Sequence, residues 1–487
     1  MRRKQYDKPT EQPTIKRIPN GCADIAHALG LKPEDTVWDY NLVYSAEGGM
    51  KLTDARFGIG HEGVTTLIRG GAQGLTLKLH KGFLDYQKKH LGVTNIVEVT
   101  EKRHENDLFS YPEHSVVHQL AEKTRQEPRL KDIFNGKVFC SFMPTPDVQR
   151  DIAVLGGKAL ISAPAAIAFN SKVRVAKDAA VHRYNVAPFV VAKSEAEVAR
   201  KIRQLKKKAA RLGLDPEKTK YWIKFGHFGA GTGVLPYDPA VTSVRDVQSW
   251  IKTTMQAAEV PSGEFIPTLM DIDIGYLPEV KQIVANLNVQ AIVSSSGIVG
   301  PDASGIAITG VTYQKTSDGH YLGGSLPLTD AEKGFAAEAI GWALPVLKAA
   351  QEQGYRGYAG IDLMLAREAS GQLRGYVLEM NGRLNSSTSL LVTAQWVEEQ
   401  SGLKDVAACN FTSTFAALKD FKSFKKIFNS VLYKGSASAH TGVIPIVLKP
   451  DAQGKIHGVK AIAVAPTAKS LAKLEKRYDA IVKKLQR

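Results

Sequence analysis

The sequence contains few cysteines and no long hydrophobic segment, and both absences restrict what the protein can be. Its three cysteines, Cys22, Cys140 and Cys409, lie far apart without Cys-x-x-Cys spacing, so the sequence predicts neither a disulfide framework nor a zinc site. No run approaches the roughly 18–20 uncharged apolar residues of a membrane span. Residues 1–17 lack the apolar core of a secretory signal. We therefore expect a cytoplasmic protein without a membrane partner.

Acidic residues are in the minority, because 64 Lys and Arg residues exceed 48 Asp and Glu residues and give a formal net charge of +16. A charge of this size raises the question of nucleic acid binding. However, the lysines are spread along amphipathic helical patterns such as 201–211 and 419–426, without interleaved aromatic residues. We interpret them as solvated helix faces whose positive field attracts anionic substrates. RNA or an acidic peptide as substrate is the weaker alternative.

Two neighbouring apolar runs carry polar side chains at alternate positions. Asp362 lies on the first run, and Glu379, Asn381 and Arg383 follow at alternate spacing on the second. Alternate side chains of a strand share one face. If the turn-like stretch 369–372 closes a hairpin, Asp362 lies directly opposite Glu379. Carboxylate and amide oxygens suit Mg²⁺, and a guanidinium suits phosphoryl or carboxylate oxygens. The alternative is a solvent-facing polar stripe.

A second signal is the glycine-rich stretch that follows an apolar run ending in Lys224. Small or aromatic residues separate its four glycines, which are Gly226, Gly229, Gly231 and Gly233. Glycines let backbone amides approach phosphate oxygens, and the lysine adds a charge that reaches a phosphate. The stretch is not a Walker A loop, because no Gly-Lys-Ser/Thr follows the glycines. A flexible hairpin tip is the alternative interpretation.

Together these parts resemble the ATP-grasp superfamily, whose members hold ATP between two α+β lobes. The order of parts agrees: a helical pattern opens at Lys172, a strand-like run follows at 187–191, and a charged helical pattern covers 193–213. Lys224 with its glycines and the acidic hairpin come next. The resemblance implies a fold of the α+β or α/β class, with an ATP-grasp unit, a preceding α/β domain and a small C-terminal α+β lobe.

The resemblance also assigns roles to individual residues. It places Lys172 and Lys224 on the phosphates of ATP, and it places two Mg²⁺ ions, with Mn²⁺ as the alternative metal, on Asp362, Glu379 and Asn381. Arg383 is expected to face the transferred phosphoryl group or the substrate carboxylate, so Arg383 and Lys224 are the expected catalytic residues. The nucleotide-covering loop is expected to contain Gly226, His227, Gly229, Gly231 and Gly233.

Within the superfamily, the sequence is most similar to the carboxylate–amine ligases of the pheganomycin type, which are peptide ligases. Residues 354–365, 378–389 and 440–450 carry this resemblance. The segment expected to contact adenine and ribose departs from the family pattern. Its candidate ribose ligands are Asp271 or Asp273, with Glu264 as an alternative. The hydroxyls of residues 386–388 either position substrate or metal-bound water, or are plain loop side chains.

The length of 487 residues predicts two or three domains. We expect an N-terminal α/β domain over 1–165, a two-lobed ATP-grasp domain over 166–425 and an appended lobe over 426–487. In the last segment, two strand-like runs precede a helical pattern with one apolar face, formed by Leu471, Leu474, Tyr478, Ile481 and Leu485. This face is expected to dock onto the rest of the protein.

The predicted function is an ATP-dependent carboxylate–amine ligase that forms an amide or peptide bond through an acyl phosphate and releases ADP and phosphate. Its expected substrates are small-molecule or peptide carboxylates and amines, and a homodimer is the family-level expectation. The glycine-rich stretch is expected to close over the reacting groups as a lid. The alternatives are an ATP-grasp kinase of small molecules and a non-catalytic, nucleotide-binding regulator.

Overall fold

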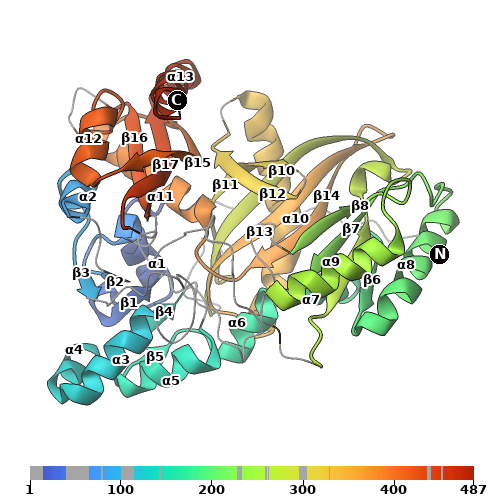
Figure 1. The fold of residues 1–487 in the computed structure, drawn as a ribbon, viewed down its shortest axis with the longest axis horizontal. Helices are drawn as coiled ribbons and strands as arrows, with labels where there is room; N and C mark the ends of the chain where they lie inside the picture. The colour runs from blue at the N-terminus through green and yellow to red at the C-terminus, as the bar shows by residue number, and fades with distance from the viewer. Residues whose placement is uncertain are drawn as a thin grey trace.

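In the residues that it describes, the computed structural model shows three β-sheets and the helices that cover them (Figure 1). The structure describes residues 15–39, 65–77, 81–99, 115–141, 144–227, 233–257, 260, 263–295, 304–317, 319–327, 329–435, 440–450 and 453–486. Gly229 and Gly231 of the expected nucleotide-covering loop lie outside this part of the chain. None of the described helices is long and apolar enough to cross a membrane.

The first sheet is parallel and belongs to the N-terminal region, which is drawn in blue in Figure 1. Its strand order is β3-β2-β1-β4-β5, so the chain moves outward from β1 on both sides. The region is α/β, as predicted. Its elements are α1 (Cys22–Ala28), β1 (Thr36–Asp39), β2 (Gln73–Leu77), α2 (Phe83–Leu91), β3 (Ile96–Val99), α3 (Val116–Gln126), α4 (Lys131–Phe134), β4 (Val138–Ser141), α5 (Pro146–Val154) and β5 (Lys158–Ala159).

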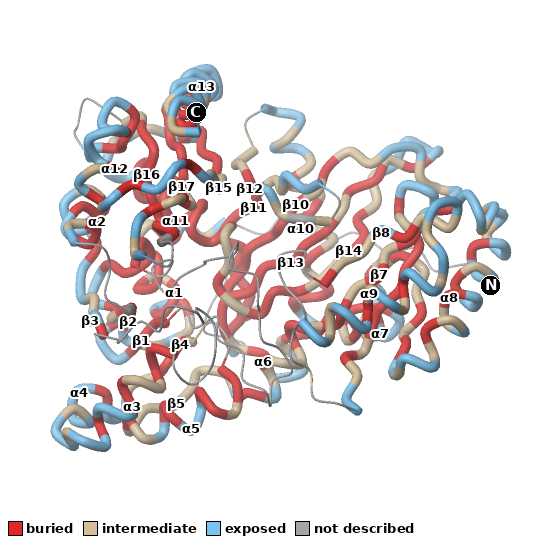
Figure 2. The backbone as a smooth tube through the Cα atoms, in the orientation of Figure 1, coloured by how far each residue is buried: buried red, intermediate tan, exposed pale blue. Residues whose placement is uncertain are grey.

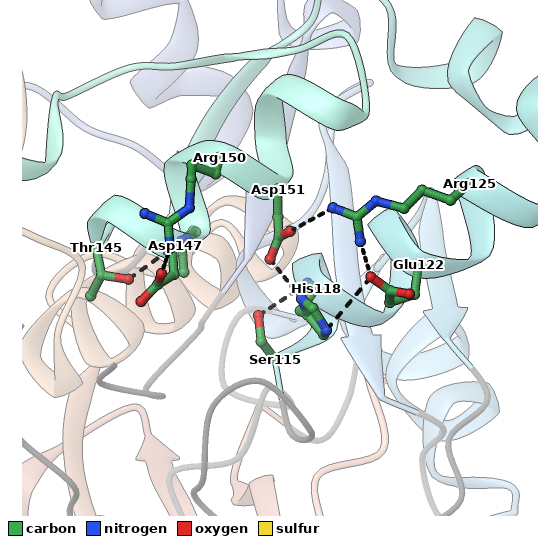
Figure 3. Close-up of polar contacts among 9 residues, drawn as sticks. Ser115, His118, Glu122, Arg125, Thr145, Asp147, Arg150 and Asp151 are labelled. Atoms are coloured by element: carbon green, nitrogen blue, oxygen red, sulfur yellow. Dashed lines mark hydrogen bonds and ion pairs between the residues drawn. The ribbon is translucent and has the colours of Figure 1, made fainter. Parts of the chain in front are cut away.

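A cluster of charged side chains joins α3 to α5 (Figure 3). His118 Nδ1 lies 2.9 Å from Asp151 Oδ2, and Arg125 Nη2 lies 3.7 Å from Asp151 Oδ1. Ser115 Oγ accepts the backbone N–H of His118 and thereby caps the start of α3. These contacts connect α3 with α5 and keep the two helices side by side.

The second sheet is antiparallel, with the order β6-β9-β7-β8, and is drawn in green in Figure 1. Along β7, Tyr221 and Ile223 are buried in one cluster with the apolar side of α8, while Lys224 belongs to the opposite face. The predicted strand at 187–191 and the charged helix at 193–213 are confirmed as β6 and α8. The elements are β6 (Phe189–Ala192), α8 (Glu195–Arg211), β7 (Tyr221–Phe225), β8 (Val234–Tyr237), α9 (Val244–Ala257) and β9 (Thr268–Ile272).

The third sheet is antiparallel throughout and has the order β14-β13-β10-β11-β12-β15-β17-β16. Its strands form much of the buried centre of the molecule (Figure 2). The elements of this region are α6 (Ala163–Phe169), α7 (Lys172–His182), β10 (Val280–Val293), β11 (Ile306–Ser317), β12 (His320–Ser325), α10 (Asp330–Glu352), β13 (Gly357–Glu368), β14 (Leu373–Asn381), α11 (Ser386–Ser401), β15 (Ala407–Leu418), α12 (Phe421–Phe428), β16 (Gly442–Pro450), β17 (Ile456–Ala465) and α13 (Ala468–Leu485).

The two faces of this large sheet differ in chemistry. On one face, Leu287 of β10 and Ile361 and Leu363 of β13 are fully buried in a cluster with Ala343 of α10. Because side chains alternate along a strand, the residues between them point to the other face. Those residues include Asp362 and carry the polar groups described below. One face of the sheet therefore provides core, and the other provides a platform for polar side chains.

The C-terminal segment continues the large sheet. The two predicted strands are present as β16 and β17, and β17 pairs with β15 of the preceding segment. The predicted apolar face of the last helix is confirmed for Leu471, Leu474 and Tyr478, which are buried against these strands. Partly buried Ile481 and Leu485 pack at the edge of the same cluster. The proposed division into domains at 165 and 425 stays a prediction.

Candidate active site

The acidic hairpin has the predicted register. Asp362 on β13 pairs directly with Glu379 on β14, and Gly360 pairs with Asn381. The chain reverses where Gly371 adopts φ +86°, a left-handed conformation that favours glycine. The pairing shifts by one residue immediately after Asp362, so a β-bulge interrupts the ladder beside the two carboxylates. Two carboxylates therefore lie side by side on one face of the sheet.

Amide side chains from three strands surround Asp362. Gln314 Nε2 on β11 donates to Asp362 Oδ1 over 2.9 Å, and Asn381 Nδ2 donates to Asp362 Oδ2 over 3.2 Å. Asn288, which pairs with Asp362 across β10 and β13, donates to Asp362 Oδ1 as well. The same Asn381 amide nitrogen lies 3.2 Å from Glu379 Oε1. Asp362 is therefore held in a fixed orientation by neutral donors.

Gly360 gives this amide group the space it needs. A Cβ atom at this position would collide with the side-chain nitrogens of Asn385, Gln290 and Asn288. Asn385 Nδ2 is buried without a hydrogen-bond partner among the described residues. A larger residue at this position would require these amide side chains to shift from their positions over the strand.

Lys172 connects the helical part of the site to the carboxylates. Its Nζ lies 2.5 Å from Glu379 Oε2, and its side chain is only 9% exposed. Lys172 is the first residue of α7, where Ser171 Oγ accepts the N–H of Arg174 as the helix cap. The backbone N–H of Lys172 donates to the carbonyl oxygen of Gly226 over 2.8 Å. The structure thus brings the start of α7, the end of β7 and the acidic hairpin together.

The two carboxyl groups differ in their proton affinity. Burial, and then the neighbouring charge of Glu379, raise the pKa of Asp362 well above its ordinary value. Burial acts to raise the pKa of Glu379, but the charge of Lys172, the hydrogen bonds with Asp362 and Lys172, and the charge of Arg383 together outweigh it, so the pKa of Glu379 is lowered. The pair therefore favours one proton or one added cation, as expected for two acids at one buried site.

Lys224 forms a separate ion pair on the small sheet. Its Nζ lies 2.7 Å from Asp271 Oδ2 on β9, and both side chains are at least 88% buried. Burial raises the pKa of Asp271, although Lys224 acts to lower it. Asp273 accepts the N–H of Gly275 on Oδ1 and the indole N–H of Trp222 on Oδ2. Both Asp273 oxygens are thus already bonded within the fold, whereas Asp271 faces the lysine.

The described part of the expected nucleotide-covering loop consists of Gly226, His227 and Gly233. The Gly226 N–H donates to the carbonyl of Pro267, and the Gly233 carbonyl accepts the N–H of Phe225. Burial, and then the charge of Lys172, lower the pKa of His227. His227 is therefore close to Lys172, while the Gly226 amide is already occupied by Pro267.

Arg383 lies two residues after the end of β14, and its charge acts on Glu379 and on the buried Tyr355. Residues 386–388 are not loop residues, because they form the first turn of α11 with Asn385 as the helix cap. Thr388 Oγ1 donates to Gln290 Oε1 over 2.9 Å. The start of α11 is thus bonded to the polar face of β10.

The structure brings together Lys172, Asp362, Glu379 and Asn381, with Arg383 beside them, and it places Lys224 with Asp271 on the neighbouring sheet. The sequence analysis missed the amides of Asn288, Gln290 and Gln314. Asn286, Asn288 and Gln290 alternate with apolar residues in the otherwise apolar stretch 283–293 of β10. This alternation was the signal for a polar sheet face. Glu264 is exposed and forms no part of either group.

Comparisons with known proteins identify the fold. The sequence matches no model of a known protein family and no curated protein. Among solved structures, the chain is similar to an N5-carboxyaminoimidazole ribonucleotide synthetase in complex with ADP (10% identity, 93% of this chain and 98% of that chain, TM-score 0.50). It is also similar to an N5-carboxyaminoimidazole synthase from Aspergillus clavatus, in complex with ADP and 5-aminoimidazole ribonucleotide (12% identity, 92% of this chain and 98% of that chain, TM-score 0.50).

A third similar structure is a biotin carboxylase from Campylobacter jejuni (13% identity, 90% of this chain and 89% of that chain, TM-score 0.50). All three similarities extend over nine-tenths of the chain or more, at low identity. The chain therefore has the ATP-grasp fold, as the sequence predicts, with the preceding α/β region and the C-terminal strands included in the likeness.

Proposed function

We propose that this protein is an ATP-dependent carboxylate–amine ligase. One observation carries the proposal: Asp362 and Glu379 lie side by side on adjacent strands, with the Lys172 ammonium against Glu379. Solved structures of the same fold hold ADP, which supports a nucleotide at the equivalent place. A fold alone does not determine a reaction, so the argument rests on the chemistry of the residues.

The residues at the hairpin fit Mg²⁺. Among the described residues, no group of three His, Cys, Asp or Glu side chains gathers as a ready metal cluster. The site instead offers two carboxylates and the amide oxygen of Asn381, and Mg²⁺ uses few protein ligands because it keeps waters and phosphate oxygens. The raised pKa of Asp362 shows that a second negative charge is costly there without a cation. When bound, Mg²⁺ would offset the charge of the β- and γ-phosphates.

The lysines are proposed to hold the phosphates. Lys172 and Lys224 are both largely buried, and they form ion pairs with Glu379 and Asp271 respectively. A phosphate chain offers stronger acceptors to the same ammonium groups. Residues of the loop between Gly226 and Gly233 would cover the phosphates with their backbone amides. Asp271 is the better placed of the two ribose candidates, because Asp273 already accepts two hydrogen bonds.

The proposed reaction has two steps. A carboxylate oxygen of the donor attacks the γ-phosphorus of ATP, the bond to the bridging oxygen breaks, and ADP leaves. The amine nitrogen of the acceptor then attacks the acyl carbon, loses a proton and displaces phosphate. Arg383 is proposed to hold the donor carboxylate and then the oxyanion of the tetrahedral intermediate. The chain contributes positioning and charge in both steps, which phosphoryl transfer chiefly requires.

Peptide or amino-acid substrates are the finer part of the proposal. The resemblance to ligases of the pheganomycin type supports them, and the positive net charge favours anionic substrates. Cytoplasmic location and a homodimer belong to the same proposal.

The test is Mg²⁺-dependent release of ADP and phosphate by the purified protein with pooled amino acids and short peptides. The Glu379→Gln variant removes a proposed metal ligand, and Glu195→Gln on the exposed first turn of α8 is its matched control. The ligase requires phosphate release that depends on both a carboxylate and an amine, with a product whose mass corresponds to condensation. Glu379→Gln should lose this turnover, and Glu195→Gln should keep it.

Other results identify the alternatives. ADP formation without free phosphate would identify a kinase, and ATP binding without turnover on any pool would favour a regulator. Equal turnover by Glu379→Gln and Glu195→Gln would remove the metal assignment.

A further inference from the structure

Three segments that are distant in the sequence meet beside the two carboxylates of the candidate active site. The backbone N–H of Lys172 donates to the Gly226 carbonyl oxygen over 2.8 Å. The backbone N–H of Gly382 donates to Asn170 Oδ1 over 3.1 Å. Residues 170–172 are therefore bonded both to the end of β7 in the small sheet and to the end of the acidic hairpin.

His227 and Arg383 each follow directly after one of these two glycines. The charge of Lys172 acts on His227, and the charge of Arg383 acts on Glu379. Lys172 Nζ in turn lies 2.5 Å from Glu379 Oε2. His227 therefore belongs to the same group of side chains as Arg383, which is proposed to hold the donor carboxylate.

The imidazole of His227 has a hydrogen-bonding position that the fold does not use. Its Nδ1 atom is buried, and none of the described residues forms a hydrogen bond with it. The residue as a whole is only half-buried, which leaves the ring within reach of a ligand. A buried nitrogen without a partner costs free energy, and a ligand that supplies a hydrogen bond offsets this cost. The site thus provides a ring nitrogen for a polar group of a substrate.

The surroundings of His227 favour its neutral form. Burial, and then the charge of Lys172, lower the pKa of His227. A neutral imidazole has one nitrogen that accepts a proton, whereas both nitrogens of an imidazolium are donors. In the tautomer with its hydrogen on Nε2, the accepting nitrogen is the buried Nδ1. The ring can therefore receive a proton at the position that the fold leaves without a partner.

The second step of the proposed reaction requires a proton acceptor. When the amine nitrogen bonds to the acyl carbon it becomes positively charged, and it must lose a proton before phosphate leaves. The proposed phosphate-binding lysines and Arg383 are donors, and the two hairpin carboxylates are proposed metal ligands. The neutral imidazole of His227 has neither task, and histidine is the commonest general base of enzymes.

We propose that His227 is the general base of amide formation and accepts a proton at Nδ1 from the attacking amine. This role rests on the ligase function proposed above. The nitrogen–carbon bond forms, one proton passes from nitrogen to Nδ1, and the bond between the acyl carbon and the phosphate oxygen breaks. The imidazolium returns the proton to the departing phosphate, which leaves as hydrogen phosphate. His227 is then neutral again, and a primary amine keeps one hydrogen as the amide N–H.

The test compares two kinds of acceptor for the same acyl phosphate, hydroxylamine and the amines of pooled amino acids and short peptides. The full-length protein receives ATP, Mg²⁺ and the same pool of carboxylates, and the hydroxamate and amide products are measured by mass. Hydroxylamine is a weaker base than an amino acid amine, so its nitrogen loses the proton to water more readily. Its reaction therefore depends less on a base from the protein.

His227→Gln removes the proton acceptor and keeps a polar side chain, and His27→Gln at the exposed last turn of α1 is its matched control. The ratio of amide to hydroxamate should fall at least about a hundredfold in His227→Gln, which is the lower end of what a general base contributes. His27→Gln should keep the ratio of the unchanged protein.

The two products also separate this role from the function on which it rests. Neither hydroxamate nor amide from the unchanged protein would contradict the ligase function, and the role of His227 would fall with it. Both products from the unchanged protein, with the same ratio in His227→Gln, would overturn the general base alone. An equal loss of both products in this variant would instead assign His227 to nucleotide binding or carboxylate activation.

Discussion

Substitution of Asp362 by asparagine removes the energetic cost of burying this carboxylate and also removes a proposed Mg²⁺ ligand. The metal-free protein should therefore become more stable, while stabilisation by Mg²⁺ and nucleotide should be lost. The pKa of Asp362 is raised by burial and by Glu379. A group whose pKa is higher in the folded protein stabilises the fold fully below its unfolded pKa, and this contribution is lost as pH rises through the folded pKa. The metal-free protein should therefore lose stability above about pH 4, with a slope of at most about 1.4 kcal/mol per pH unit.

The expected magnitude follows from the sheet register. Opposed residues place the charges of Asp362 and Glu379 about 5 Å apart, which gives a repulsion of about 3 kcal/mol at an effective dielectric constant of about 20. The Lys172 charge offsets part of it. Asparagine would also place a donor opposite Asn381 Nδ2, which costs about 1 kcal/mol. Asp362→Asn should thus stabilise the metal-free protein by about 1–2 kcal/mol at pH 7.

Other titrating groups do not obscure the result. The pKa of Glu379 is lowered, so its stabilising contribution is already complete above the ordinary pKa of a glutamate and stays constant between pH 5 and 7. The pKa of His227 is lowered by burial and Lys172, so this residue costs stability as pH falls. Both groups are present in the unchanged protein and in the variant. The difference between the two proteins therefore reports on Asp362 and on its interaction with Glu379, whose pKa the hydrogen bond with Asp362 helps to lower.

The assay is urea unfolding with a metal chelator at pH 5, 6 and 7, with Asp330→Asn at the exposed start of α10 as the control. The stability gap between Asp362→Asn and the unchanged protein should widen as pH rises. Mg²⁺ with an ATP analogue should stabilise the unchanged protein and Asp330→Asn, but not Asp362→Asn. Parallel pH profiles for all three proteins, or a variant that is less stable at every pH, would refute the reasoning.

Three further predictions follow from the site. Lys224→Met should weaken ATP binding, measured by calorimetry, at least tenfold. The substitution removes a charge-assisted contact to phosphate and leaves Asp271 without its cation. Unchanged affinity for ATP would exclude Lys224 from the phosphate site. Gly360→Ala should lower the free energy of unfolding by about 1–3 kcal/mol, because the added methyl collides with Asn385 and Gln290. An unchanged free energy of unfolding in urea would show that these amide side chains move aside. Chelation of Mg²⁺ should abolish nucleotide-induced stabilisation in a thermal melt, whereas a melting shift that persists without divalent ions would contradict the carboxylate site.

The acidic hairpin was predictable because residues close together in the sequence determine its turn and its register. Gly371 and its neighbours specify the turn, and the two-residue period of a strand then places Asp362 opposite Glu379. The helix at Lys172 and the strand before Lys224 were predictable for the same reason, since caps and apolar periodicity lie within a few residues. The fold class came from the resemblance of these elements, in their order along the chain, to the ATP-grasp superfamily.

The partners of these residues were not predictable, because they come from distant segments. Asp362 receives hydrogen bonds from Asn288 and Gln314, and strand order in the large sheet decides which amides reach it. The contact of Lys172 with Glu379 spans two hundred residues and depends on how α7 docks. The helix that begins at Ser386 is a different case, because its cap, Asn385, is a local signal that the sequence analysis did not use. The alternation along β10 marks a polar face, but which distant residue each amide meets depends on tertiary structure.

The measurement that tests the central claim most directly follows oxygen from the donor carboxylate. Pooled amino acids and short peptides carrying ¹⁸O in their carboxyl groups are incubated with the protein, ATP and Mg²⁺, and the released phosphate is analysed by mass. An acyl phosphate intermediate transfers one carboxyl oxygen to phosphate when the amine displaces it, so the account predicts phosphate with one ¹⁸O atom. Released phosphate without the label would contradict the account.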